Sequence, residues 1–319
     1  MTDAARTFWL RAQRRAAALE PELSRALLRA FQIIRDAVPQ TELARIIDSG
    51  HFETLLQAAF ADAVLDRAFL PVRDRLRSIT ADAVRYFARD LPRGGRVDGG
   101  IAVSFDVLNP RVIDAIRALD TKVIQTLKDD VRETVRAYVE NAVRDGVGPR
   151  TVARDLRDVI GLAPNQARAV DNYRTLLETG DSAALRRQLR DKRYDRTTAR
   201  AFGADGEGLP ADTIDAMVAA YRKKMLAFNA ETNARTATLD ALKAGQRLSW
   251  QDAIDAGIVD GARLVKRWIG VKDDRERPEH LAMEGETVPF DQPFSNGEMI
   301  PGDSTYNCRC IPAYYQARP

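Results

Sequence analysis

The chain has 319 residues, of which 45% are hydrophobic and 30% are charged, a composition that excludes an intrinsically disordered protein. The formal net charge is only +3, so a nucleic-acid site would depend on local clusters of charge. No run approaches the roughly 18 apolar residues that a membrane span needs, and the first residues lack the apolar core of a signal peptide. We therefore expect synthesis in the cytoplasm and no membrane contact.

The first ninety residues carry apolar side chains at steps of three and four, which is typical of helices with one buried face. This spacing predicts an N-terminal helical region over residues 1–90. Within it, we expect Pro21 to begin a second helix that Pro39 ends, and Pro71 to interrupt the helices that follow.

The segment 91–100 contains four glycines and one proline, and it is predicted to be a hinge. Residues 101–106 alternate like a short strand, although an extended connector has the same pattern. Asn109 and Pro110 then predict the start of a long helix that ends near Arg144. The central helical region, residues 101–202, continues with helices predicted over 150–160, 164–177 and 182–201.

The break at residues 145–153 reads Asp-Gly-Val-Gly-Pro-Arg-Thr-Val-Ala. It is similar to the hairpin of a helix-hairpin-helix module, in which backbone N–H groups hold a DNA phosphate. A helix end followed by proline in the first turn of the next helix explains the same residues without a ligand. Both interpretations stay open.

The predicted helix over 182–201 has the highest density of basic side chains in the chain. Exposed basic residues contact DNA phosphates with little sequence preference, but charge runs are also common on solvated helix faces. The candidate DNA-binding residues are Arg186, Arg187, Arg190, Lys192, Arg193, Arg196 and Arg200. A second hinge is predicted at 203–210, before a helix over 211–242 that ends near Gly245.

The rarest reactive side chains lie close together at the C-terminus. Cys308 and Cys310 are the only cysteines, and His280 is one of two histidines. These ligands suit zinc, and Asp273, Asp274 or Glu279 could supply the fourth; the candidate metal residues are His280, Cys308, Cys310 and Asp274. Alternatively, the histidine donates to a loop carbonyl and the cysteines are small buried hydrophobes. A Cys-His pair beside an acid also suggests a thiol hydrolase.

Several residues of the C-terminal third resemble the signature of the phage head-morphogenesis family, the Mu F-like minor head proteins. Their order is a Thr-Glu-Thr-type helix, a tryptophan, an Asp-x-x-Arg-x-x-His run, a glycine and a final Asn-Cys-Arg-Cys. Ala230 replaces the first threonine of the helix. The residues that carry the resemblance are Glu231, Thr232, Trp268, Asp274, Arg277, His280, Gly285, Asn307, Cys308, Arg309 and Cys310.

The resemblance implies a head-morphogenesis domain over residues 211–319, ending in a cap over 263–319. The expected fold is mainly α, with an elongated multi-helix body and a small irregular α+β C-terminal cap. The cap's Asp274, Arg275 and Arg277 are expected to form a buried charge cluster, with Asp274, Arg277 and His280 sharing one helix face.

The resemblance also implies a non-enzymatic minor head protein that acts in procapsid assembly and then resides in the virion, in the head interior or at the portal vertex. Its implied partners are the portal protein and capsid or scaffold proteins, with nonspecific contacts to double-stranded DNA. Two alternatives stay open. One is a metal- or thiol-dependent hydrolase or toxin-like enzyme that uses the cap, and the other is a sequence-nonspecific DNA-binding protein.

Overall fold

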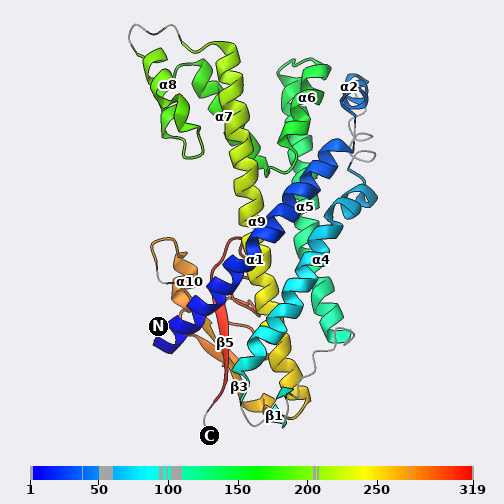
Figure 1. The fold of residues 1–319 in the computed structure, drawn as a ribbon, viewed down its shortest axis with the longest axis vertical. Coiled ribbons are helices and arrows are strands. Elements are labelled where there is room, and N and C mark those ends of the chain that lie inside the picture. Colours follow the sequence, from blue (N-terminus) through cyan, green and yellow to red (C-terminus); the bar gives the residue numbers. More distant parts are fainter. Residues whose placement is uncertain are drawn as a thin grey trace. The chain divides into compact units, whose positions relative to one another are not determined.

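The computed structural model describes residues 3–37, 39–49, 60–92, 96–97, 100–101, 110–203, 206, 208–271 and 273–317. The fold is mainly α-helical with a small α+β region at the C-terminus, as predicted (Figure 1). The α-helices are α1 Asp3–Asp36, α2 Gln40–Asp48, α4 Asp62–Phe87, α5 Pro110–Arg144, α6 Pro149–Val159, α7 Pro164–Glu178, α8 Asp195–Ala201, α9 Ala211–Asp255 and α10 Pro278–Met283.

Short 3-10 helices and strands complete the secondary structure. The 3-10 helices are η1 Ala88–Asp90, η3 Ser182–Arg186, η4 Lys192–Tyr194 and η5 Gly261–Arg263. Two short strands, β1 Arg96–Val97 and β2 Gly100–Ile101, pair within the predicted first hinge. The C-terminal strands are β3 Leu264–Ile269, β4 Thr287–Pro289 and β5 Ile311–Gln316. Most of the strand predicted over 101–106, and the predicted cap Asn109, lie outside the described residues.

Two prolines that were predicted to break helices lie inside them. Pro21 is within α1 and Pro71 is within α4, so both predictions were wrong. An interior proline removes one backbone donor and crowds the preceding turn, which costs about 3 kcal/mol. Buried side chains on both sides offset this cost, among them Leu23 in α1 and Val72 in α4, each 0% exposed.

The predicted helix end at Gly245 was also wrong, because α9 continues to Asp255. Gly245 lies where α9 meets α4: a Cβ added there would be 2.5 Å from the Cβ of Ala83 and 2.7 Å from the carbonyl oxygen of Thr80. Here glycine permits a close helix contact instead of ending the helix.

The segment between α5 and α6 has the structure of two helix caps. Gly146 has a φ of 69°, and the Val147 N–H donates to the Ala142 carbonyl at 2.9 Å. This is the bonding pattern of a Schellman motif. Gly148 caps α6, and Pro149 occupies its first turn. The cap interpretation therefore accounts for these residues.

The chain forms two compact units. Unit 1 comprises Met1–Ser24, Val72–Val123 and Thr232–Pro319, and unit 2 comprises Arg25–Pro71 and Ile124–Glu231. Each unit contains residues of all three predicted regions. In unit 2, the rings of Tyr173 and Tyr221 stack with their centroids 4.4 Å apart. In unit 1, Val84, Ile116 and Leu248 form one core cluster.

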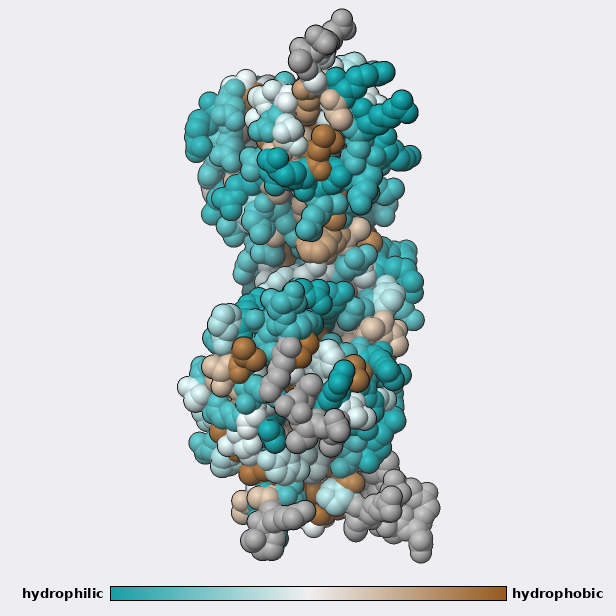
Figure 2. Space-filling view, turned by 90° about the vertical axis from the view of Figure 1, so that its left-hand side faces the viewer, coloured by the Kyte–Doolittle hydropathy of each residue, from teal (hydrophilic) through white to brown (hydrophobic). Residues whose placement is uncertain are grey.

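The surface in view is largely polar. Figure 2 shows a mostly hydrophilic face, on which the hydrophobic residues, drawn in brown, form small separate groups. Within the described part of the chain, no helix is both long enough and apolar enough to cross a lipid bilayer.

Candidate functional site

The C-terminal cap lies in unit 1 and is built on a three-stranded antiparallel sheet with the order β4-β3-β5. Trp268 of β3 pairs with Pro312 of β5, and Arg267 pairs with Thr287 of β4. Alternate residues of β3 point into the cap, so Leu264, Lys266 and Trp268 are all buried. This register brings the end of β3 beside the Asn-Cys-Arg-Cys segment that leads into β5.

A buried cluster of two thiols and one imidazole lies at this end of the sheet. The Nδ1 atom of His280, in α10, is 3.3 Å from Cys308 Sγ and 3.6 Å from Cys310 Sγ. The ligand atoms of the three residues all lie within 4.8 Å of one another. All three side chains are buried, with 4%, 5% and 2% exposure for His280, Cys308 and Cys310.

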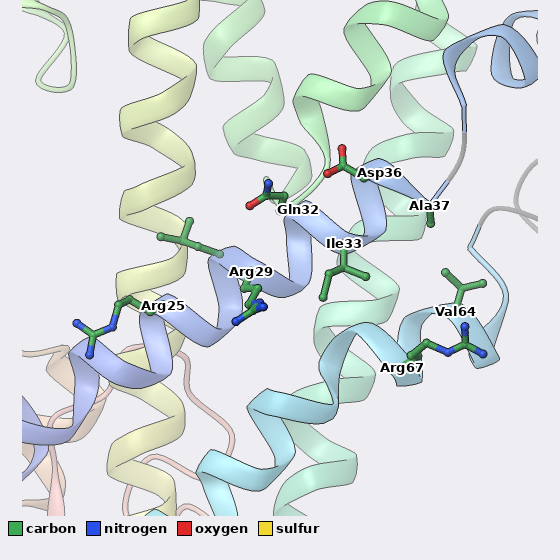
Figure 3. A pocket seen from close by; sticks show the side chains of 9 residues that line it. Arg25, Arg29, Gln32, Ile33, Asp36, Ala37, Val64 and Arg67 are labelled. Carbon is green, nitrogen blue, oxygen red and sulfur yellow. The ribbon is translucent and has the colours of Figure 1, made fainter.

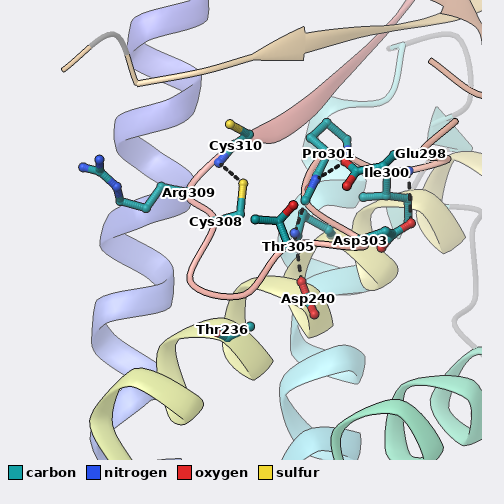
Figure 4. Close-up of polar contacts among 12 residues, drawn as sticks. Thr236, Asp240, Glu298, Ile300, Pro301, Asp303, Thr305, Cys308, Arg309 and Cys310 are labelled. Atoms are coloured by element: carbon teal, nitrogen blue, oxygen red, sulfur yellow. Dashed lines mark hydrogen bonds and ion pairs between the residues drawn. The ribbon is translucent and has the colours of Figure 1, made fainter. Parts of the chain in front are cut away.

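The contacts around the cluster set its orientation. Thr305 Oγ1 lies 3.3 Å from the other ring nitrogen of His280. The Cys310 N–H donates to Cys308 Sγ at 3.3 Å (Figure 4). Trp268 packs edge-on against the imidazole, with the ring centroids 5.5 Å apart. Trp268 also belongs to the hydrophobic cluster that contains both cysteines. The imidazole is therefore held in one orientation, with Nδ1 facing the sulfurs.

The two thiols differ strongly in acidity. The hydrogen bond with Cys310 lowers the pKa of Cys308, and nearby Lys243 and His280 act in the same direction against burial. The same interaction, together with burial, raises the pKa of Cys310. The pair therefore favours a thiolate at Cys308, stabilised by a hydrogen bond and by nearby positive charge.

The loop before the cysteines is held by buried charged groups. Glu298 accepts from the Gly302 N–H at 2.7 Å and the Ser304 N–H at 3.1 Å. Lys243 of α9 donates to the Pro301 carbonyl at 2.9 Å and pairs with Asp240 at 2.9 Å (Figure 4). These contacts attach the loop to α9 and position Cys308.

The acidic residues of the cap are arranged differently from the prediction. Asp274, Arg275 and Arg277 are exposed, so the predicted buried charge cluster was wrong. The carboxylate that pairs with an arginine is Asp273, which accepts two hydrogen bonds from Arg309, both at 2.7 Å. These bonds lower the pKa of Asp273 to about 2.

The predicted helix face shared by Asp274, Arg277 and His280 does not form, because α10 begins only at Pro278. Proline restricts the preceding residue to extended conformations, and Arg277 accordingly has a φ of −68° and a ψ of 141°. Arg277 donates to the Tyr306 carbonyl at 3.0 Å. The exposed Asp274 is not in the group of three candidate ligands.

Other residues of the family signature have structural roles. Asn307 has a φ of 57°, a left-handed conformation that asparagine tolerates better than most residues, and its N–H donates to Thr236 Oγ1 at 3.1 Å. Gly285 has a φ of 87° and lies against Arg267. In α9, Glu231 is exposed and Thr232 is buried.

Three further residues of the site were not predicted. Glu276 Oε1 is 3.7 Å from Cys310 Sγ, Thr305 contacts the imidazole, and Lys243 holds the loop. Glu276 and Thr305 lie in turns without periodicity, and Lys243 lies on a helix almost sixty residues before the loop. Short-range sequence patterns therefore could not indicate these contacts.

The candidate DNA-binding residues do not lie on one helix, which corrects the prediction for 182–201. The side chains of Asp181 and Asp191 accept hydrogen bonds from the backbone at Ala183 and Arg193, respectively, and divide the segment into η3, η4 and α8. Arg190 pairs with Asp195 at 2.8 Å and Arg193 with Asp191 at 2.6 Å. Arg187 is partly buried. The exposed basic residues are Arg186, Lys192, Arg193, Arg196 and Arg200.

Unit 2 also contains an open groove of about 960 Å³ that is lined by residues of α1 and α4. Figure 3 shows three arginines around it, Arg25, Arg29 and Arg67. Its acidic residue, Asp36, pairs with Arg157 at 2.9 Å. The groove therefore carries local positive charge, although the protein as a whole is nearly neutral.

The fold and the cap define a mainly helical protein that ends in a small sheet closed over a buried Cys-His cluster. Residues 209–312 match the family described as Phage Mu protein F like protein, which confirms the resemblance seen in the sequence. The match covers about a third of the chain, namely α9 and most of the cap. No curated protein and no solved structure matches the chain. The matched family suggests a phage head protein.

Proposed function

We propose that the protein is a minor head protein that acts in procapsid assembly, by docking noncovalently on the portal or on the inner surface of the capsid. The observation that carries this proposal is the family match over residues 209–312, the segment that contains the Cys-His cluster. Burial of the cluster supports a structural role, because a hydrolase needs a nucleophile that its substrate can reach. Cys308 is only 5% exposed.

The test is co-expression with the portal protein of the same phage, followed by native mass spectrometry. We expect a stable complex of defined stoichiometry, and no complex with the portal of an unrelated phage as the matched control. Free protein in both mixtures, with no complex on capsid or scaffold proteins either, would contradict the assembly role.

Nonspecific contact with double-stranded DNA is a second proposed property, supported by the exposed basic residues of η3, η4 and α8. If these side chains contact phosphates, affinity falls roughly tenfold or more between low and physiological salt. The double variant Arg196→Glu/Arg200→Glu should lose most of the binding. The exposed pair Arg14→Glu/Arg85→Glu is the control with the same change in net charge, and equal losses in both variants would contradict a local site.

A further inference from the structure

Hydrogen bonding between Cys308 and Cys310 accounts for only part of the arrangement of the Cys-His cluster. Both sulfurs face the same nitrogen, His280 Nδ1, at 3.3 and 3.6 Å. A neutral imidazole nitrogen has one lone pair, so it can accept a proton from only one of the two thiols. Three polar groups that converge on one buried point indicate a ligand between them.

The spacing of these atoms matches the coordination sphere of a metal ion. Ligand atoms bound to tetrahedral zinc at about 2.0 to 2.3 Å lie roughly 3.3 to 3.8 Å from one another. The two distances from His280 Nδ1 to the sulfurs fall in this range. Thiolate sulfur and imidazole nitrogen are also the ligands that zinc prefers.

The contacts of the second ring nitrogen orient the histidine as a ligand. Thr305 Oγ1 is 3.3 Å from Nε2 of His280. With the proton on Nε2 donated to this hydroxyl, the lone pair of Nδ1 points at the sulfurs. Metal-binding histidines are commonly oriented by a hydrogen bond of this kind.

Two donors are placed to stabilise bound thiolates. The Cys310 N–H donates to Cys308 Sγ at 3.3 Å. The Trp268 side chain, 0% exposed, packs in the same cluster as both cysteines, and its indole N–H is directed at Cys310. A donor directed at a sulfur favours the thiolate form.

A carboxylate lies beside one of the three ligands, Cys310, outside the group whose ligand atoms lie within 4.8 Å of one another. Glu276 Oε1 is 3.7 Å from Cys310 Sγ and accepts from the Val271 N–H at 3.2 Å. Gly270 makes this position accessible, because a Cβ on residue 270 would be 2.0 Å from the same oxygen. Glu276 is therefore directed at the cluster, whereas Asp274 and Glu279 are exposed.

We propose that His280, Cys308, Cys310 and Glu276 form a structural zinc site that holds the cap together. The ligands come from the turn before α10, from α10 itself and from the segment before β5. One ion would thus join the segment between β3 and β4 to the segment between β4 and β5. Four protein ligands, three of them buried, characterise a structural site, whereas catalytic sites keep an open position.

The test uses the full chain, purified in the presence of Zn²⁺ with any affinity tag removed and then dialysed. We expect one zinc per chain by native mass spectrometry and by elemental analysis. A strong chelator should remove the ion, lower the Tm and make both cysteines reactive toward a thiol reagent. Replacement by Co²⁺ should give the thiolate-to-cobalt absorption bands of a tetrahedral site, a readout that does not require any variant to fold.

Variants then assign the ligands. Cys308→Ser/Cys310→Ser should retain no zinc, and Glu276→Gln should release zinc to the chelator at least tenfold faster than the wild type. Asp274→Asn and Glu279→Gln, two exposed acids of the same segment, are the matched controls and should release zinc at the wild-type rate.

The absence of zinc from the wild type together with the absence of cobalt–thiolate bands would overturn the proposal. So would zinc that is retained by the double cysteine variant, or thiols that react equally fast with and without chelator. Wild-type zinc release from Glu276→Gln would overturn the assignment of the fourth ligand. Zinc content is measured on the isolated protein, so these outcomes are independent of portal binding.

Discussion

Lys266 is a lysine at a core position of β3. Its side chain is fully buried, its ammonium group donates to the Met299 carbonyl at 2.7 Å, and it lies 5.1 Å from the centre of the Phe294 ring. Burial lowers the pKa of Lys266 to about 8, from 10.5 in the unfolded chain. The folded state therefore releases this proton at lower pH than the unfolded state does.

This difference predicts a pH-dependent stability. Between pH 8 and 10.5 the unfolded chain binds more protons at Lys266, so the free energy of unfolding rises with pH, by at most about 3 kcal/mol. Lys266→Met should remove this rise, whereas the exposed Lys223→Met should keep it. Urea unfolding of the three proteins across the same pH range measures the effect, and parallel curves for the wild type and Lys266→Met would contradict it.

Gly302 is the glycine on which the position of Cys308 depends. Its φ is 80°, and a Cβ added there would be 2.6 Å from the Cβ and 2.7 Å from the Sγ of Cys308. Gly302→Ala combines a left-handed backbone with a steric clash and should reduce the free energy of unfolding by about 2 to 4 kcal/mol.

The control for Gly302→Ala is Gly297→Ala. Gly297 has a similar φ of 85°, but nothing lies within 4 Å of an added Cβ. This variant should therefore lose only the backbone term, about 1 to 2 kcal/mol. Thermal and urea unfolding compare the two variants, and equal losses would show that packing against Cys308 contributes nothing.

Among the secondary-structure elements, the contact between α4 and α9 determines what Gly245 does. Replacing an interior helix glycine by alanine normally stabilises a protein by about 1 kcal/mol. Here the new methyl group would overlap with Ala83 and with the Thr80 carbonyl. We therefore predict that Gly245→Ala destabilises the protein by about 1 to 3 kcal/mol, because overpacking exceeds the gain in helix propensity.

The close helix contact can be tested with a second substitution. Ala83→Gly removes the nearest clashing atom, so the double variant Gly245→Ala/Ala83→Gly should be more stable than the sum of the two single changes predicts. The predicted overlap between residues 245 and 83 would be contradicted by additive effects in urea unfolding. It would also be contradicted by a Gly245→Ala variant that is more stable than the wild type.

At the scale of the whole molecule, the first helix is tied to the segment that leads into the last strand, both within unit 1. Trp9 Nε1 and Gln13 Nε2, both in α1, donate to the Arg309 carbonyl at 3.0 and 3.1 Å. Arg309 lies between the two cysteines of the cap. The N-terminal helix thus supports the segment that carries the candidate metal ligands, across some 300 residues of sequence.

Loss of this contact should loosen the cap. The variant Trp9→Phe/Gln13→Ala leaves the Arg309 carbonyl without either donor, and we expect a destabilisation of about 1 to 3 kcal/mol. Hydrogen exchange should increase at residues 307–312 and remain unchanged in α7 of unit 2. Arg14→Ala, an exposed change on the same helix, is the control, and equal exchange in both variants would contradict the role of α1.

The sequence alone determined the features that depend on neighbouring residues. Periodic apolar positions predicted the mainly α fold, because one buried helix face requires them, and Asn109 with Pro110 predicted where α5 begins. The family signature indicated the head-protein family and the cysteines and histidine of the site. The rarity of those side chains was sufficient to select them.

The tertiary structure decided everything that depends on distant partners. Pro21, Pro71 and Gly245 lie inside helices because packing outweighs local propensity, and sequence patterns do not contain that packing energy. The carboxylates are a second case. Their positions in the sequence do not distinguish Asp273, Asp274, Glu276 and Glu279 from one another. In the folded cap, however, Asp273 contacts Arg309 and Glu276 contacts Cys310. Turn geometry and long-range contacts set those directions, and neither has a period in the sequence.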